Sequence, residues 1–266
     1  MKRLNSNSLK LIAIIAMTID HIADLLYPGM PNNIIPNICH IIGRLTAPIM
    51  FFFICEGYFY TKDVKKYIKR LFIFAIISHF AYCFAFGINF IPFSTGNIFN
   101  QTSIMWTLAW SVVALHIVYG NNKLKEWQRW LLVILLNLVT FSSDWSSIGL
   151  MIILTIYEHR GNLNKQMINM IFWTLIYALV SFLFVSKIYG IIQLSVILVY
   201  PLLKMYNDEV GRVKWMKWFF YIYYPLHLLI IGILRIMLYE KMLDINYIYF
   251  AFVSIIYQKL VFRLIV

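Results

Sequence analysis

Charged side chains are scarce in this chain. They make up 13% of its 266 residues, whereas 62% are hydrophobic and the mean hydropathy is +0.76. Soluble domains are about 25% charged and about 45–50% apolar, so the composition excludes an ordinary soluble globular protein. It predicts an all-α, multi-pass protein of the cell (cytoplasmic) membrane, embedded in the lipid bilayer.

Acidic residues are the scarcest charged class. The chain has 11 Asp and Glu against 23 Lys and Arg, a net charge of +12. In a soluble protein such an excess would suggest nucleic-acid binding. Here the basic residues lie in short loops between apolar segments, the pattern of cytoplasmic loops in membrane proteins. We therefore expect no nucleic-acid partner.

Cysteine and the common catalytic motifs are also missing or sparse. Cys39, Cys55 and Cys83 show no CxxC spacing, so we interpret them as small buried residues rather than as a disulfide or metal site. GxSxG, GxxxxGK[ST], HExxH and GxGxxG are absent. Nothing therefore indicates a serine hydrolase, a P-loop ATPase, a zinc protease or a dinucleotide cofactor, and we expect no metal.

Apolar segments fill the rest of the chain. At ~1.5 Å per residue, about 20 residues span the ~30 Å hydrocarbon core of a bilayer. Ten segments, two of them short, fit this pattern: 9–27, 38–60, 69–91, 103–119, 129–143, 146–158, 167–185, 188–203, 216–238 and 246–264. We predict about ten transmembrane helices in a single integral-membrane domain, residues 1–266. The last segment is alternatively an interfacial helix.

The loop charges predict the orientation. All but four of the 23 basic residues fall on the side of the N-terminus, the exceptions being Arg44, Lys187, Arg235 and Lys241. Positively charged loops face the cytoplasm. Both termini are therefore expected to be cytoplasmic.

The first apolar segment contains three polar residues that lipid would not tolerate. A charged group at the bilayer centre costs several kcal/mol, so Asp20, His21 and Asp24 should face a protein interior or a wet cavity. Asp20 and Asp24 are four residues apart and share a helix face. A neutral imidazole beside carboxylates accepts protons, so we expect His21 to act as a general base oriented by Asp20 or Asp24. The alternative is a packing histidine with solvated acids.

The second segment carries His40 and Arg44 on one helix face. Arg44 has no acid within its own helix turn, so its partner is expected from Asp20 or Asp24. Pro48 is expected to kink the helix. Arg44 is then either a catalytic group that stabilises negative charge or one half of a buried brace.

A basic run follows this segment. Lys65, Lys66, Lys69 and Arg70 begin the third segment, and helix N-terminal amides together with basic side chains suit phosphate groups. The alternative is that this run serves only as a topology signal.

Four further polar residues lie in or next to apolar segments: Glu56, His79, Asp144 and His227. We expect them around the substrate, although each is also compatible with a structural role. Pro225 lies two residues before His227 and frees a backbone carbonyl, which favours a polar site there.

Four stretches of the chain occur in a characteristic order: LKLIAIIAMTIDHIADLL (9–26), IIGRLTAPIMFFFICEGYFYT (41–61), KKYIKRLFIFAIISHFAY (65–82) and FYIYYPLHLL (220–229). Weaker matches are IMWTL (104–108), residues 144–149 and YNDEVG (206–211). Together they resemble the TraX family of integral membrane proteins and, through it, the transmembrane acyltransferases. Members usually have glycine where Asp208 stands, so a different turn is expected there.

The resemblance implies acetyl transfer from cytoplasmic acetyl-CoA, as a co-substrate, to an acceptor beyond the membrane. Pilin acetylation in conjugation is the family example, and a peptide, glycan or lipid acceptor fits the same chemistry. Lys10 and His21 match the superfamily's basic residue and histidine separated by ten positions, and Lys66, Lys69 and Arg70 match its basic pair. Lys10 would then join the cofactor site at the cytoplasmic edge. Alternatives are an ion-coupled transporter or flippase and a non-catalytic assembly factor of a conjugation or pilus system.

Overall fold

The computed structural model describes residues 3–29, 33–92, 98–121, 123–211, 213 and 215–239. Within these ranges all regular elements are helical, and pairing of the β type is limited to the isolated bridges Leu4–Tyr206 and Thr102–Ser143. The elements are α1 (Ser6–Leu26), α2 (Ile34–Gly43), α3 (Thr46–Tyr60), α4 (Val64–Phe86), α5 (Ile104–Tyr119), α6 (Glu126–Thr140), α7 (Ser146–Glu158), α8 (Leu163–Phe184), α9 (Lys187–Gln193), the 3-10 helix η1 (Leu194–Leu198), α10 (Val199–Lys204) and α11 (Met216–Tyr239).

These helices confirm the all-α class and lie close to the first nine predicted segments. Among the described residues, five helical stretches are long and apolar enough to cross a membrane: 34–60, 64–86, 163–184, 187–204 and 216–239. The helices α5 and α7 are apolar but shorter, and α1 carries three charged residues. The apolar helices indicate a membrane protein, but ten spans are not established, and the segment 246–264 lies outside the described residues.

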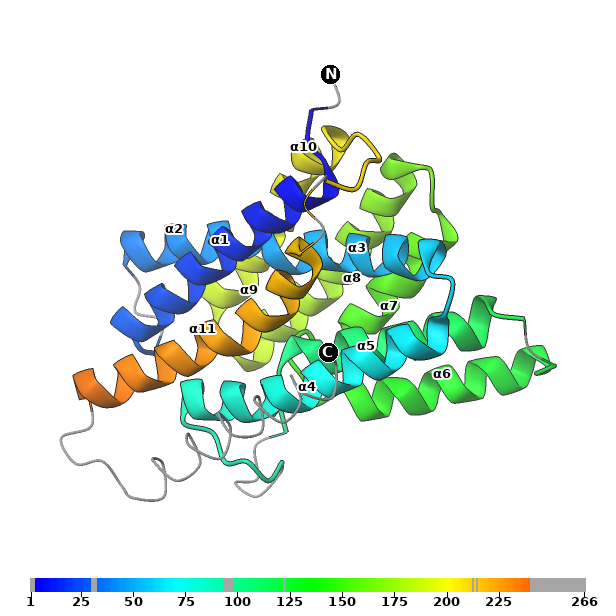
Figure 1. Ribbon diagram of the computed structural model, residues 1–266. Helices are drawn as coiled ribbons and strands as arrows, with labels where there is room; N and C mark the ends of the chain where they lie inside the picture. The colour runs from blue at the N-terminus through cyan, green and yellow to red at the C-terminus, as the bar shows by residue number, and fades with distance from the viewer. Residues whose placement is uncertain are drawn as a thin grey trace.

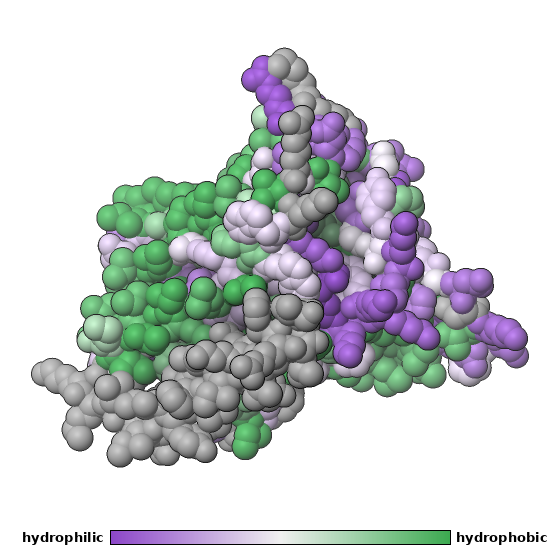
Figure 2. Space-filling view, viewed as in Figure 1, coloured by the Kyte–Doolittle hydropathy of each residue, from purple (hydrophilic) through white to green (hydrophobic). Residues whose placement is uncertain are grey.

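The helices pack as a bundle in which α1, α11 and α4 lie side by side and α8 and α9 lie behind them (Figure 1). The chain begins at the end of the bundle where α1 starts (Figure 1). Hydrophilic residues gather at the end where α4 begins, and hydrophobic residues cover the opposite flank (Figure 2). In this view the molecule therefore has one polar end and one apolar flank.

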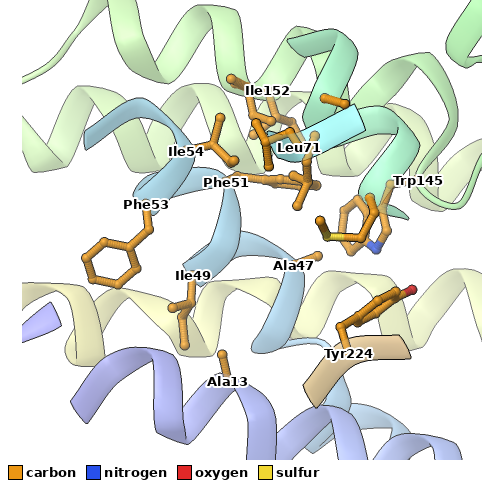
Figure 3. Close-up of a cluster of buried hydrophobic side chains, with 14 of the residues drawn as sticks. Ala13, Ala47, Ile49, Phe51, Phe53, Ile54, Leu71, Trp145, Ile152 and Tyr224 are labelled. Carbon is orange, nitrogen blue, oxygen red and sulfur yellow. The ribbon is translucent and has the colours of Figure 1, made fainter. Parts of the chain in front are cut away.

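Helix α3 lies at the centre of the bundle. It is apolar on all sides, and Ile49, Phe51 and Cys55 are fully buried, as expected for a helix surrounded by other helices. Phe51 packs among Leu71 of α4 and Ile152 of α7 (Figure 3). This central packing fixes the distances between the surrounding helices.

The outer faces of the bundle are apolar. On α8, Ile168, Phe172, Leu175 and Leu179 are all more than half exposed and recur at intervals of three and four residues, which places them on one side of the helix. Such an exposed apolar stripe is the kind of surface that a membrane-spanning helix presents.

The predicted kink occurs between α2 and α3. Pro48 has no N–H for the carbonyl of Arg44, and the helix is interrupted at Arg44 and Leu45, one turn before the proline. Gly43 ends α2 directly against the side chain of Asp20, in the space that a Cβ atom would need. The interruption therefore holds Arg44 next to α1.

The turn at Asp208 and the three cysteines can be compared directly with what the sequence predicts. Asp208 has φ +61°, a conformation that favours glycine, so the aspartate occupies a glycine-type turn and the expected departure is not seen in its backbone. Cys55 and Cys83 are buried and Cys39 is partly buried, and all three are free thiols, as the sequence predicts.

Candidate active site

A cavity of about 590 Å³ opens between α1, α4 and α11. Five of the predicted site residues line it: Asp20, His21, Asp24, Arg44 and Asp144. They come from α1, from the α2–α3 junction and from the turn before α7. Sequence-distant segments therefore meet at the predicted polar cluster.

Asp20 is the central acid of this cluster. Its Oδ2 accepts a hydrogen bond from Arg44 Nη2 at 2.9 Å, and its Oδ1 lies 2.8 Å from His40 Nδ1. Arg44 Nη1 also donates to Gln193 Oε1 at 3.3 Å. All of these side chains are buried, so the ion pair is screened little by water. The predicted partner of Arg44 is confirmed as Asp20.

The orientation of His21 differs from the prediction. We expected Asp20 or Asp24 to orient it, but both carboxylates face His40: Asp24 Oδ1 lies 3.8 Å from His40 Nε2. Successive residues of a helix point about 100° apart, so residues 20 and 24 face α2 while residue 21 faces away from it. His40 was not among the predicted site residues, although its spacing of four from Arg44 on one helix face indicated it.

His21 instead contacts α11. Its Nδ1 lies 2.9 Å from His227 Nε2. The two ring planes are within 4° of parallel, with centroids 5.1 Å apart. The edge of His21 also meets the ring of Phe86. His227, which we predicted near the substrate, is therefore the direct partner of the predicted base.

Asp144 reaches the cavity from a constrained turn. Trp145 and Ser146 both have positive φ, 63° and 47°, which costs about 1–3 kcal/mol per residue outside glycine. Trp145 packs edge-on against Phe51 and stacks on Tyr177, and this packing holds the turn. Burial raises the pKa of Asp144 to about 6.

A second cavity, of about 550 Å³, lies toward the start of α4. Its described lining includes four basic residues, Lys10, Lys62, Arg70 and Lys217, and no acidic one. Aromatic rings support these cations: Lys10 Nζ lies 4.7 Å from the centroid of Phe53, and Arg70 lies 5.3 Å from that of Tyr221. The chemistry of this lining suits an anion with a flat or apolar part.

The basic run contributes to this cavity only in part. Lys65, Lys66 and Lys69 are exposed and do not line it, whereas Arg70 does. At the N-terminus of α4 the side chain of Asp63 accepts a hydrogen bond from the Lys66 amide at 2.9 Å, so this amide is already engaged. This hydrogen bond holds the pKa of Asp63 below its usual value. Of the residues predicted to bind the cofactor, Lys10 and Arg70 line this cavity, together with Lys62 and Lys217, which we did not predict.

The two cavities adjoin. Both are lined by Met17, Thr46, Ala47, Ile104 and Tyr224. The basic cavity and the cavity that contains His21 therefore border each other along these shared residues.

Glu56 and His79 lie apart from this site. Glu56 forms a bidentate pair with Arg160, with Nε to Oε1 at 2.8 Å and Nη2 to Oε2 at 3.0 Å. His79 binds Thr102 Oγ1 and the carbonyl of Phe90, at 3.0 and 2.9 Å. Both contacts brace neighbouring segments, and neither residue lines either of the two cavities.

Asp20, Asp24 and His40 are close enough to be considered as metal ligands, since one atom from each lies within 4.8 Å of the others. The oxygens of Asp20 are already engaged by His40 and Arg44. A guanidinium 2.9 Å from a carboxylate repels a cation and removes the donor that the ion needs. The donor set therefore fits an ion-pair network better than a metal centre.

Comparison with known proteins shows the family to which this chain belongs. The chain is 27% identical over 226 residues to the "Probable fimbrial assembly protein FimC, serogroup H1" of Dichelobacter nodosus, covering 83% of this chain and 91% of that protein. No solved structure matches the chain. The model of the family described as "TraX protein" matches residues 5–235, and with this match over most of its length the chain belongs to the TraX family.

Proposed function

We propose that this protein is a membrane-embedded acyltransferase. It moves an acetyl group from cytoplasmic acetyl-CoA to an amine or hydroxyl of an acceptor on the outer side of the membrane. The observation that carries the proposal is the adjoining pair of cavities, one lined by cations and the other containing a histidine with a polar network. A donor with phosphates at one end and a thioester at the other fits that arrangement.

The basic cavity is the proposed donor site. CoA carries several phosphate charges, and charge-assisted hydrogen bonds to them are about twice as strong as neutral ones. Lys10, Lys62, Arg70 and Lys217 supply the positive charge, with no acid in the described lining to oppose it. Tyr67 and Tyr221, which also line this cavity, offer rings for the adenine. The narrow pantetheine arm then extends toward the junction with the second cavity.

The reaction takes place at His21. The acceptor nitrogen or oxygen forms a bond to the thioester carbonyl carbon as His21 takes its proton. The carbon–sulfur bond then breaks, and the proton passes from His21 to the leaving thiolate. Arg44 lines the same cavity, with Nη2 bound to Asp20 and Nη1 bound to Gln193, so its positive charge favours the developing oxyanion.

The acceptor enters from the far end of the His21 cavity. A pilin or other peptide, a glycan or a lipid satisfies the chemistry. The name of the Dichelobacter nodosus relative, a probable fimbrial assembly protein, favours an acceptor that belongs to a pilus. In that case the acetyl group would modify a pilus component.

The same name favours a second candidate, an assembly factor of a pilus or conjugation system that acts without catalysis. Such a protein would use its surface and would tolerate changes at His21 and Asp20. An ion-coupled transporter is the further alternative, but a basic pocket beside the polar site suits a phosphate-bearing donor better than a small solute.

The test uses the purified protein in detergent with acetyl-CoA carrying a labelled acetyl group, with and without membrane extract. We expect slow release or transfer of the label, loss of both in His21→Ala, and retention in His79→Gln, a change outside both cavities. Near-wild-type transfer by a well-folded His21→Ala protein would remove the role of His21. No turnover, together with no thermal stabilisation by acetyl-CoA, would support the assembly factor.

A further inference from the structure

We infer that His227 is a positioning residue that fixes the tautomer of His21, so that the lone pair of His21 Nε2 is the one that faces the cavity. The assignment follows from a chain of three groups: the Tyr223 carbonyl, the His227 ring and the His21 ring. It deepens the proposed function, because it names the atom of His21 that takes the proton.

The first of these three groups is the Tyr223 carbonyl, whose chemistry makes it a hydrogen-bond acceptor. His227 Nδ1 lies 3.0 Å from the backbone oxygen of Tyr223. A carbonyl oxygen can only accept a hydrogen bond. The proton of this contact must therefore be on Nδ1 of His227, since two lone pairs at this distance would repel.

The protonation state of His227 decides which ring donates the hydrogen bond between the two histidines. His227 is buried, and among the described residues no carboxylate lies within salt-bridge distance of it. A buried imidazole without a counter-ion is neutral, so its Nε2 carries a lone pair. At 2.9 Å from that nitrogen, His21 Nδ1 must be the donor.

The parallel ring planes support this direction. A hydrogen bond between two imidazole nitrogens is best aligned when both rings lie in one plane, because the lone pair and the N–H lie in the ring plane. The planes of His21 and His227 differ by only 4°. Their centroids are 5.1 Å apart while the two nitrogens are 2.9 Å apart, so the rings lie edge to edge in nearly one plane rather than face to face. The 2.9 Å contact is therefore a hydrogen bond between the two rings rather than an accident of packing.

The third step assigns the remaining nitrogen. With its proton on Nδ1, a neutral His21 has a lone pair on Nε2. This atom makes no hydrogen bond with the residues that the structure describes, and His21 lines the cavity with Asp24 and Arg44. The base is therefore available on the nitrogen opposite to the one that His227 holds.

A second contact fixes the two helices in register. Thr18 Oγ1 donates to the Ile14 carbonyl at 2.8 Å, so in its 2.7 Å contact with Tyr223 it accepts from the phenolic hydroxyl. The Tyr223 ring also stacks on His227 at 5.3 Å between centroids. One residue of α11 therefore anchors α1 through its side chain and His227 through its carbonyl. This is the arrangement by which a protein orients a catalytic histidine, with the usual carboxylate replaced by a second imidazole.

Two substitutions separate positioning from mere packing. His227→Gln retains an acceptor in its amide oxygen, whereas His227→Ala removes the acceptor. His79→Gln is the matched control, since it changes a partly buried histidine that lines neither cavity. Each protein is purified in detergent and its thermal unfolding is recorded, so that a folding defect is recognised.

The decisive readout is nitrogen NMR of the protein with ¹⁵N-labelled histidine, in which the His21 signals are assigned by their loss in His21→Ala. We expect the Nδ1–H form of His21 in the wild type, in His227→Gln and in His79→Gln, and a shift toward the Nε2–H form in His227→Ala. A wild-type His21 with its proton on Nε2 would overturn the inference, as would an unchanged tautomer in a folded His227→Ala protein.

The kinetic readout follows from the same assignment. General-base catalysis is typically worth about 10²–10⁴-fold, so kcat of acetyl transfer should fall about 10²-fold in His227→Ala with little change in the KM for acetyl-CoA. His227→Gln should recover most of that loss. Equal losses in folded His227→Gln and His227→Ala would count against the inference. If the wild type transfers no acetyl group, the proposed function fails and the NMR result alone decides the tautomer.

Discussion

Asp20 and Arg44 form a buried ion pair across two helices, with Nη2 of the arginine 2.9 Å from Oδ2 of the aspartate. The pair joins the middle of a long helix to the interruption between α2 and α3. His40 satisfies the other oxygen of Asp20, so the pair is part of a network. A buried pair contributes little net stability, because both ions lose their water, but it strongly disfavours any arrangement in which one ion is left alone. It therefore specifies how α1 and α2 meet.

The first prediction concerns this pair. Asp20→Asn should lower stability by about 3–5 kcal/mol, since it leaves the Arg44 charge buried without its counter-ion. The double change Asp20→Asn with Arg44→Gln should cost less than the sum of the two single changes. Thermal unfolding in detergent measures all three. Simple additivity would show that the two side chains do not depend on each other.

The second prediction concerns Gly43, which approaches Asp20 too closely for any side chain. Gly43→Ala should displace the Asp20 carboxylate from His40 and Arg44, and so reproduce the loss of stability of Asp20→Asn. Ile38→Ala is the control, because this side chain on the same helix is exposed and should change the unfolding temperature little. A Gly43→Ala protein as stable as the wild type would mean that α2 can move away from α1 freely.

The sequence was informative where a polar residue interrupts an apolar segment. The energy of burying a charge in lipid is large enough that Asp20, His21 and Arg44 had to meet something, and they line one cavity. The approximate helix boundaries followed from the lengths of the apolar segments, because polar loops separate them. The interruption before Pro48 follows from a missing N–H, which is a property of the residue itself.

The sequence was uninformative where the outcome depends on how helices rotate against one another. Whether Asp20 or His227 orients His21 is decided by about 100° of rotation around α1, and no local pattern fixes that angle. Lys62 and Lys217 are more than 150 positions apart, since 217 − 62 = 155, and only the packing of α11 against α4 brings both to one cavity. A charge run such as Lys65 and Lys66 is conspicuous in a sequence but faces solvent in the structure.

The third prediction separates the basic residues of the cavity from those outside it. Lys10→Gln and Lys217→Gln should each raise the KM for acetyl-CoA about 10-fold to 100-fold, because a hydrogen bond to a charged group is worth about 1.5–3 kcal/mol. Lys66→Gln should change it less than about threefold, since an exposed pair such as that of Lys66 and Asp63 contributes little. Measurement of initial rates over a range of acetyl-CoA concentrations distinguishes the two groups. The reverse order would place the proposed donor site on the outer face of α4 instead of in the cavity.

The fourth prediction concerns the cost of keeping Asp144 at the cavity. Its pKa is raised to about 6 by burial, against 3.8 for the free side chain. The folded state therefore binds more protons than the unfolded state between pH 4 and pH 6, and stability falls as the pH rises through this interval. At one pKa unit per ~1.4 kcal/mol, and allowing for water at the cavity mouth, the penalty above pH 6 is about 1–3 kcal/mol. Asp144→Asn should remove it, so the variant should unfold at a higher temperature than the wild type at pH 7.5, while the two proteins converge near pH 4. A variant that is less stable at pH 7.5 would show that the carboxylate is held by a favourable partner, and its place at the cavity would then need no functional reason.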